Sequence, residues 1–228
     1  INRLADEAGN FRILGDHLST ADLTRIAFSH SSGLMPQQPH WRRAVFLKEV
    51  IIQNFRGYKN QHRIPLAQLT AFIGKNDSGK SSVFEALAIF FDHPLVKIDA
   101  ADICVHAGSS GELRLGCVFG DFPDSLTLDV SSETTLADEY LLNANGDLEI
   151  HKVFEFADGS LKKPKILAVA VHPTASGLDG LLYKKHTDLK KIAEEAGVDE
   201  SVDKRSNAAL RKGIWASSLG LALSEVEL

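Results

Sequence analysis

Residues 70–91 read TAFIGKNDSGKSSVFEALAIFF, and this stretch decides the fold. Its centre, from Gly74 to Ser81, matches the phosphate-binding pattern G-x-x-x-x-G-K-[S/T] without a mismatch. The short apolar run at 69–73 predicts a buried strand that ends at Gly74. The apolar residues of 81–91 recur with a period near 3.6 and predict a helix. Strand, glycine-rich loop and helix therefore follow one another in the order that phosphate binding requires.

A loop of this kind points consecutive backbone N–H groups at one place, and the dipole of the following helix adds positive potential there. We expect Gly74 and Gly79 to allow the close approach of a phosphate that a Cβ would block. Lys80 is expected to reach the β- and γ-phosphates, Ser81 to bind Mg²⁺ through its hydroxyl, and Ser82 to contact the α-phosphate. The predicted site also includes Lys75, Asn76, Asp77 and Ser78, the last three mainly through their backbone. The motif therefore predicts ATP and Mg²⁺ as ligands.

Hydrolysis requires more than this loop, notably an acidic metal ligand at the end of an apolar strand, the Walker B element. The apolar run at 166–171 ends in His172 and Pro173, and the run that reaches Asp158 alternates like a half-exposed strand. We therefore predict no catalytic residue within this chain, which should bind ATP but hydrolyse it poorly alone. The alternatives are a nucleotide-gated assembly module with little turnover, and a structural fragment with a vestigial loop.

The composition is that of an ordinary globular protein, with 44% hydrophobic and 24% charged residues over 228 positions. The net charge of −5 leaves no global basic surface, so DNA contact would need a local patch or another segment. No apolar run is long enough to span a membrane, and the first residues do not form a signal peptide. Cys104 and Cys117 form no C-x-x-C pair, which favours a reducing, cytoplasmic location. Cys104 and His106 lack a second ligand pair, which favours a buried cysteine over a metal site.

The chain divides into an appendage or linker at 1–44 and a domain at 45–228. Residues 18–28 predict a short helix within the first part. In the second part a strand at 45–55 is followed by a turn and a second strand before the glycine-rich loop. Further strands are predicted at 111–122, 125–130, 148–159 and 164–171, and helices at 186–197 and within 204–223. The lysines at 184–191 are expected on a solvated helix face, with DNA contact as the alternative.

Residues 46–91 resemble the N-terminal end of SMC/RecF-type ABC ATPases, in particular the OLD (overcoming lysogenization defect) family. The resemblance rests on Asn54-Phe55-Arg56-Gly57, on LTAFIGKNDSGKSS and on Glu85-Ala86-Leu87. It extends more weakly over 45–228. It implies an α/β P-loop NTPase fold, an ABC-type head with an antiparallel β-rich subregion and C-terminal helices. It also implies that Arg56 lies near the nucleotide, whereas we expect Glu85 on the helix surface or in a structural hydrogen bond.

In that family the head is assembled from both ends of a long polypeptide. The resemblance implies that 45–228 is the N-terminal part, with the Walker B element and signature motif supplied from elsewhere. It further implies a homodimer that sandwiches ATP and regulates a DNA-directed activity, such as a Toprim nuclease in phage defence or DNA repair. DNA contact would then come through the C-terminal part, and no membrane partner is expected.

Overall fold

The computed structural model describes residues 45–228 apart from 77, 123–125, 130–131, 199–201 and 219. The appendage at 1–44, with its predicted helix at 18–28, lies outside the described residues. The described chain forms two compact units. We call 45–122 with 149–168 the sheet unit, and 126–148 with 169–228 the helical unit. In the described part of the chain, no helix is long and apolar enough to cross a membrane.

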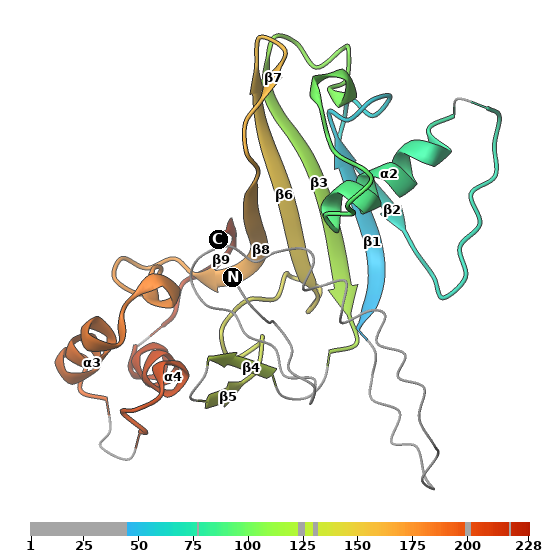
Figure 1. Cartoon of the computed structure of the whole chain (residues 1–228). Helices are drawn as coiled ribbons and strands as arrows, with labels where there is room; N and C mark the ends of the chain where they lie inside the picture. The colour runs from blue at the N-terminus through green and yellow to red at the C-terminus, as the bar shows by residue number, and fades with distance from the viewer. Residues whose placement is uncertain (1–44, 77, 123–125, 130–131, 199–201, 219) are drawn as a thin grey trace, which may run out of the picture. The chain divides into compact units, whose positions relative to one another are not determined.

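The sheet unit is built on long antiparallel strands, which stand side by side in Figure 1. The strand order is β2-β1-β3-β6-β8, and β7 pairs with β6. Their bounds are β1 (Phe46–Gln53), β2 (His62–Pro65), β3 (Ser110–Gly120), β6 (Leu148–Ala157), β7 (Ser160–Leu161) and β8 (Lys165–Pro173). Leu148 of β6 and residues 169–173 of β8 are counted with the helical unit. β1 pairs with β3 in a register that sets Ile51 opposite Gly116. A side chain at Gly116 would meet Ile51 and His151 at 3.1 Å, so this glycine makes room for its neighbours.

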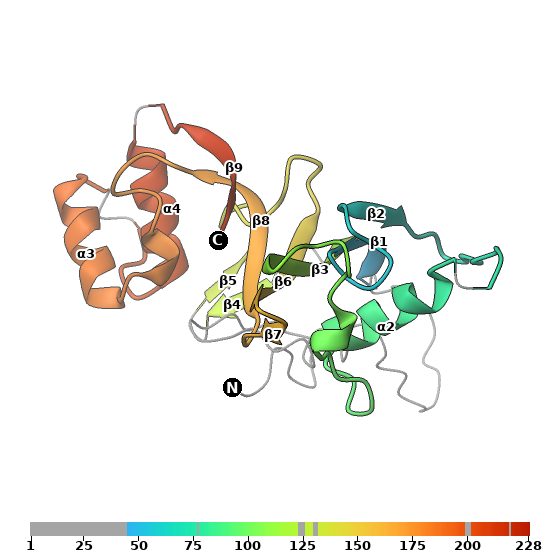
Figure 2. The same cartoon turned by 90° about the horizontal axis from the view of Figure 1, so that it is seen from above.

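One helix, α2 (Lys80–Phe90), packs against β1 and β3, whose direction it crosses at an angle in Figure 1, and lies beside them in Figure 2. Its buried face consists of Val83, Ala86, Ile89 and Phe90, at the spacing that the sequence predicts. Burial of this apolar stripe is the main source of stability for a helix of this length. The helix that the sequence predicts after the loop is therefore confirmed, whereas the strand predicted before the loop is not.

The predicted strand at 69–73 is wrong for this structure. Leu69 is 90% exposed and Ile73 is 94% exposed, and the segment has no strand assignment. A β-strand exists only where its backbone N–H and C=O groups pair with a neighbouring strand. In the described residues, no strand is paired with this segment. The sequence correctly marks an apolar segment, but within the described part of the chain it has no strand beside it to pair with.

The helical unit packs α3 (His186–Glu195) against α4 (Asn207–Ser217), with the 3₁₀ turn η2 (Leu181–Tyr183) beside them. Its buried cluster consists of Leu181, Leu189, Ala193, Leu210, Ile214 and Trp215. Both helices were predicted from their apolar spacing. The unit also holds the pair β4 (Leu126–Asp129) and β5 (Ser132–Thr134), and β9 (Leu223–Glu227), which pairs with Val169–Pro173 of β8. The strand β9 was not predicted, because the sequence favoured helix up to 223.

Candidate nucleotide-binding site

The glycine-rich loop lies in the sheet unit and ends at the first residue of α2. The Nζ atom of Lys80 donates hydrogen bonds to the carbonyl oxygen of Gly74 (2.8 Å), to that of Lys75, and to Oγ of Ser78 (3.3 Å). The ammonium group is thus held by its own loop. The structure therefore brings Gly74, Lys75, Ser78 and Lys80 together, while Asp77 lies outside the described residues.

The beginning of α2 is open to an anion. No side chain caps its first turn, and no acidic residue lies in that turn. The first N–H groups of a helix have no partner within the helix and carry the positive end of its dipole. Ser81 is exposed and Ser82 is half-buried, so both hydroxyls can be approached from solvent. These features are the ones a phosphate group needs.

Gly79 has a backbone conformation that only glycine adopts readily. Its φ is +84°, in the left-handed region. A Cβ built on it would lie 2.8 Å from the hydroxyl oxygen of Tyr58 and 3.1 Å from two ring carbons of Tyr58. The tyrosine hydroxyl donates a hydrogen bond to the Gly79 carbonyl at 3.2 Å. Both conformation and space therefore require glycine at this position of the motif.

Arg56 is held by two carboxylates rather than lying free beside the loop. Its Nε atom donates to Oδ1 of Asp102 at 2.8 Å, and its Nη2 atom pairs with Glu85 of α2. Partial burial alone would lower the pKa of the Arg56 guanidinium, but the hydrogen bonds to Glu85 and Asp102 raise it above its usual value. Arg56 therefore stays charged and ties α2 to the segment at 99–103.

The acids at Asp99 and Asp102 serve this local structure. Each side chain accepts from a backbone N–H across the turn η1 (Ala100–Asp102), which makes a reciprocal capping box. Asp102 is 7% exposed, and its own carbonyl accepts the N–H of Arg56 at 2.7 Å. In this structure its carboxylate is thus engaged by Arg56 and by a backbone amide.

Sequence reasoning missed Tyr58 and the pairing partner of Glu85. The sequence placed Glu85 on the helix surface or in a structural hydrogen bond, and the structure gives it an ion pair with Arg56. Tyr58 has no motif of its own. The sequence signal for Tyr58 is its position directly after Asn54-Phe55-Arg56-Gly57, the stretch that carries the resemblance to SMC/RecF-type ATPases.

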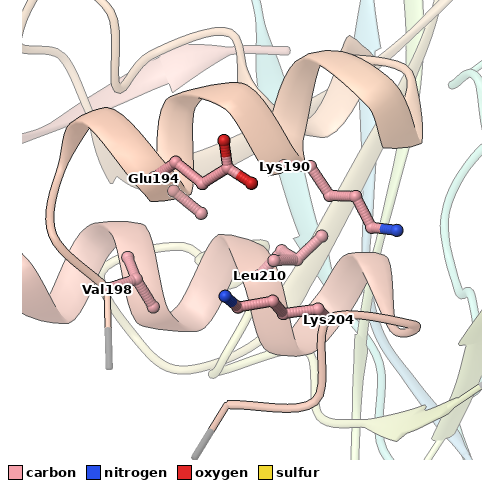
Figure 3. Close-up of a pocket in the computed structure, with 6 residues that line it drawn as sticks. Lys190, Glu194, Val198, Lys204 and Leu210 are labelled. Carbon is pink, nitrogen blue, oxygen red and sulfur yellow. The ribbon is translucent and has the colours of Figure 1, made fainter. Parts of the chain in front are cut away.

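A small hollow lies between α3 and α4 in the helical unit, lined in part by Lys190, Glu194, Lys204 and Leu210 (Figure 3). Its volume is about 10 Å³, whereas sites for nucleotide-sized ligands are typically about 300–1,000 Å³. It therefore has room for a water molecule at most. Among the residues that the structure describes, no three His, Cys, Asp or Glu side chains are grouped to hold a metal ion.

Comparison with known families shows that residues 46–219 match the AAA ATPase domain family. The chain belongs to this family. The match covers most of the chain and includes the whole of the glycine-rich loop and α2. This AAA ATPase domain therefore has an α/β P-loop ATPase fold, here with an antiparallel sheet and additional helices, and nucleotide binding by a P-loop is its family property.

Among solved structures, one chain comes from work on the structural biochemistry of ATP-driven dimerization and DNA-stimulated activation of SMC ATPases. Its identity with this AAA ATPase domain is 14% and its TM-score is 0.34. The match covers 54% of the present chain and 68% of that one. No curated protein matches the chain.

Proposed function

We propose that this chain binds ATP with Mg²⁺ at the loop from Gly74 to Ser82. The observation that carries the proposal is the G-x-x-x-x-G-K-S motif placed directly before the uncapped first turn of α2. A triphosphate there would take the place of the loop carbonyls around Lys80. The ammonium group would then exchange the carbonyl oxygens of Gly74 and Lys75 for the β- and γ-phosphate oxygens.

The other roles follow from the positions of the side chains. The N–H groups after Gly79 would donate hydrogen bonds to the β-phosphate, and the exposed Ser81 hydroxyl would bind Mg²⁺. When bound, Mg²⁺ would neutralise charge between the β- and γ-phosphates. The proposed site also includes Lys75, Asn76, Asp77, Ser78, Ser82 and Arg56, the last as a positive group near the nucleotide that is held by Glu85 and Asp102.

Replacing Lys80 by alanine tests this proposal. We expect the Kd for Mg²⁺-ATP to rise at least about 100-fold, because two or more charge-assisted hydrogen bonds are lost together. Binding would be measured by calorimetry and with a fluorescent ATP analogue on the full 228-residue chain. Lys97→Ala is the matched control, since this lysine is exposed and outside the motif. Equal affinity of the wild type and Lys80→Ala would refute the proposal.

We further propose that the chain acts within an ATPase head of the SMC/RecF and OLD type, one that dimerises around ATP and regulates a DNA-directed activity. The support is the resemblance of the Asn54–Gly57 turn and the loop, together with the exposed segment at 69–73. Leu69 and Ile73 are almost fully exposed, and Phe84 is 57% exposed and packs edge-on against Phe72 at 5.3 Å between ring centroids. Exposed apolar side chains gathered on one segment are typical of a surface that another part of a protein covers. We assign the C-terminal part of the same head as the part that covers this surface.

Hydrogen exchange tests this assignment. The comparison is between the 228-residue chain and a longer protein that continues past Leu228 in the same reading frame. In the longer protein the amides of 70–73 should exchange at least about 100-fold more slowly, because strand pairing protects them. The amide of Ile51, already in β1, should not change. If the reading frame ends at Leu228, or if exchange at 70–73 is the same in both products, the assignment is wrong.

A further inference from the structure

Tyr58 contacts the point at which the phosphate loop becomes a helix. Its hydroxyl donates to the carbonyl of Gly79 at 3.2 Å, and the same carbonyl accepts the N–H of Val83 at 3.3 Å. The ring lies against the α-carbon of Gly79, since a Cβ there would come within 3.1 Å of two ring carbons. The Tyr58 ring therefore fixes Gly79 both by a hydrogen bond and by contact.

The turn that carries Tyr58 is itself firmly held. Phe55 is fully buried, and the N–H groups of Phe55 and Tyr58 bond to each other's carbonyls at 3.0 and 2.9 Å. Asn54 donates from its side chain to the Glu112 carbonyl at 2.7 Å, and its own carbonyl accepts the N–H of Cys104 at 2.9 Å. The turn is thus attached to β3 and to the segment after η1, which makes it a rigid support.

The phosphate loop, in contrast, is held mainly by local contacts. Lys80 bonds back to Gly74 and Lys75, and the N–H of Ser78 bonds to the Lys75 carbonyl at 3.3 Å. These local bonds involve the groups that a triphosphate would displace or reorient. The hydrogen bond from Tyr58 does not involve these groups, because its acceptor is the carbonyl of Gly79, whereas a phosphate would bind the N–H groups that follow. It can therefore persist when nucleotide enters.

We infer that Tyr58 is a positioning residue for nucleotide binding, which holds Gly79 in its left-handed conformation so that the following N–H groups converge on the phosphate. The inference rests on the proposed nucleotide function of the loop. Arg56, in the same turn, pairs with Glu85 further along α2, so the turn holds the helix at two points. A group held in its bound conformation in advance binds more tightly, because less ordering is needed on binding.

Tyr58→Phe tests the hydrogen bond while keeping the ring. The Kd for Mg²⁺-ATP should rise about 3- to 10-fold, because Gly79 is then held less firmly in the conformation that binds phosphate. The thermal unfolding midpoint should fall by no more than about 4 °C, the loss that one hydrogen bond accounts for. Tyr183→Phe is the matched control, since Tyr183 is 68% exposed and lies in the helical unit. A second measurement uses Gly79→Ala. Its effect on Kd should be smaller in a Tyr58→Ala background, because the ring that the new methyl group would meet is gone.

The outcomes separate the two proposals. If Lys80→Ala loses binding while Tyr58→Phe binds like the wild type, the positioning role is overturned and the nucleotide site stands. If Lys80→Ala binds like the wild type, the nucleotide site itself fails. A fall of the Tyr58→Phe unfolding midpoint by clearly more than about 4 °C, in parallel with affinity, would mean a merely structural role and would overturn the inference as well. If Gly79→Ala raises the Kd by the same factor with and without Tyr58→Ala, the inference is likewise overturned.

Discussion

Replacing Arg211 by alanine is expected to lower the free energy of unfolding of the helical unit by about 3–5 kcal/mol. Arg211 lies on α4 and is 7% exposed, and its partner Glu139 is 1% exposed. The guanidinium makes a two-point contact, with Nε to Oε2 at 2.7 Å and Nη2 to Oε1 at 2.8 Å. Removing it leaves a carboxylate buried without its cation. That uncompensated charge, more than the lost attraction, is the reason for the large effect.

The adjacent residue supplies the control. Lys212 pairs with Asp138 at 2.9 Å, next to the buried pair in sequence, but its side chain is 66% exposed. This pair lowers the pKa of Asp138, chiefly through the hydrogen bond from Lys212. Water screens such a pair, so Lys212→Ala should cost only about 0–1 kcal/mol. The joint change Arg211→Met with Glu139→Leu removes both charges and should recover most of the loss.

Urea unfolding followed by Trp215 fluorescence measures these effects, because Trp215 is buried in the helical unit. A Trp41→Phe background leaves Trp215 as the only tryptophan of the chain. Equal losses for Arg211→Ala and Lys212→Ala, or no recovery in the joint variant, would contradict the argument that burial decides the difference.

The sequence predicts those elements whose pattern is complete within a short window. The strand β1, the helix α2 and the helices α3 and α4 all carry their apolar period locally, and the structure confirms them. The loop from Gly74 to Ser81 is likewise a local motif. Its position before α2 could therefore be predicted, and the AAA ATPase domain family supports the same conclusion.

The remaining features depend on residues far apart in the chain. Tyr58 meets Gly79 across 21 positions, Arg56 meets Asp102 across 46, and Lys152 meets Asp92 across 60. No local period encodes such contacts. The segment at 69–73 has an apolar pattern that favours a strand, yet it forms none. A strand also needs a partner strand, which the pattern of its own residues does not supply. Local pattern thus indicated the site, whereas its supports came only from the structure.

Replacing Lys152 by methionine is expected to destabilise the sheet unit by about 1.5–3 kcal/mol, the range for hydrogen bonds that involve a charged group. Lys152 lies on β6, is 4% exposed, and reaches the last turn of α2. Its Nζ atom donates to the carbonyls of Ile89 (3.1 Å) and Phe90 (3.4 Å), and it forms an ion pair with Asp92. The final carbonyls of a helix lack partners within the helix and carry the negative end of its dipole, so a cation there is stabilising.

The matched control is Lys165→Met in the same unit. Lys165 pairs with Glu155, and this pair together with Lys162 lowers the pKa of Glu155 to about 2, yet the Lys165 side chain is 64% exposed. We expect its replacement to leave the unfolding free energy nearly unchanged, because water screens this exposed pair. Hydrogen exchange gives the local measurement. In Lys152→Met, amides in the last turn of α2 should exchange faster, whereas in Lys165→Met they should not. Because α2 begins at Lys80, loosening its C-terminal end in Lys152→Met should also weaken Mg²⁺-ATP binding. If both the amide exchange and the affinity of Lys152→Met equal those of the wild type, Lys152 does not hold the helix.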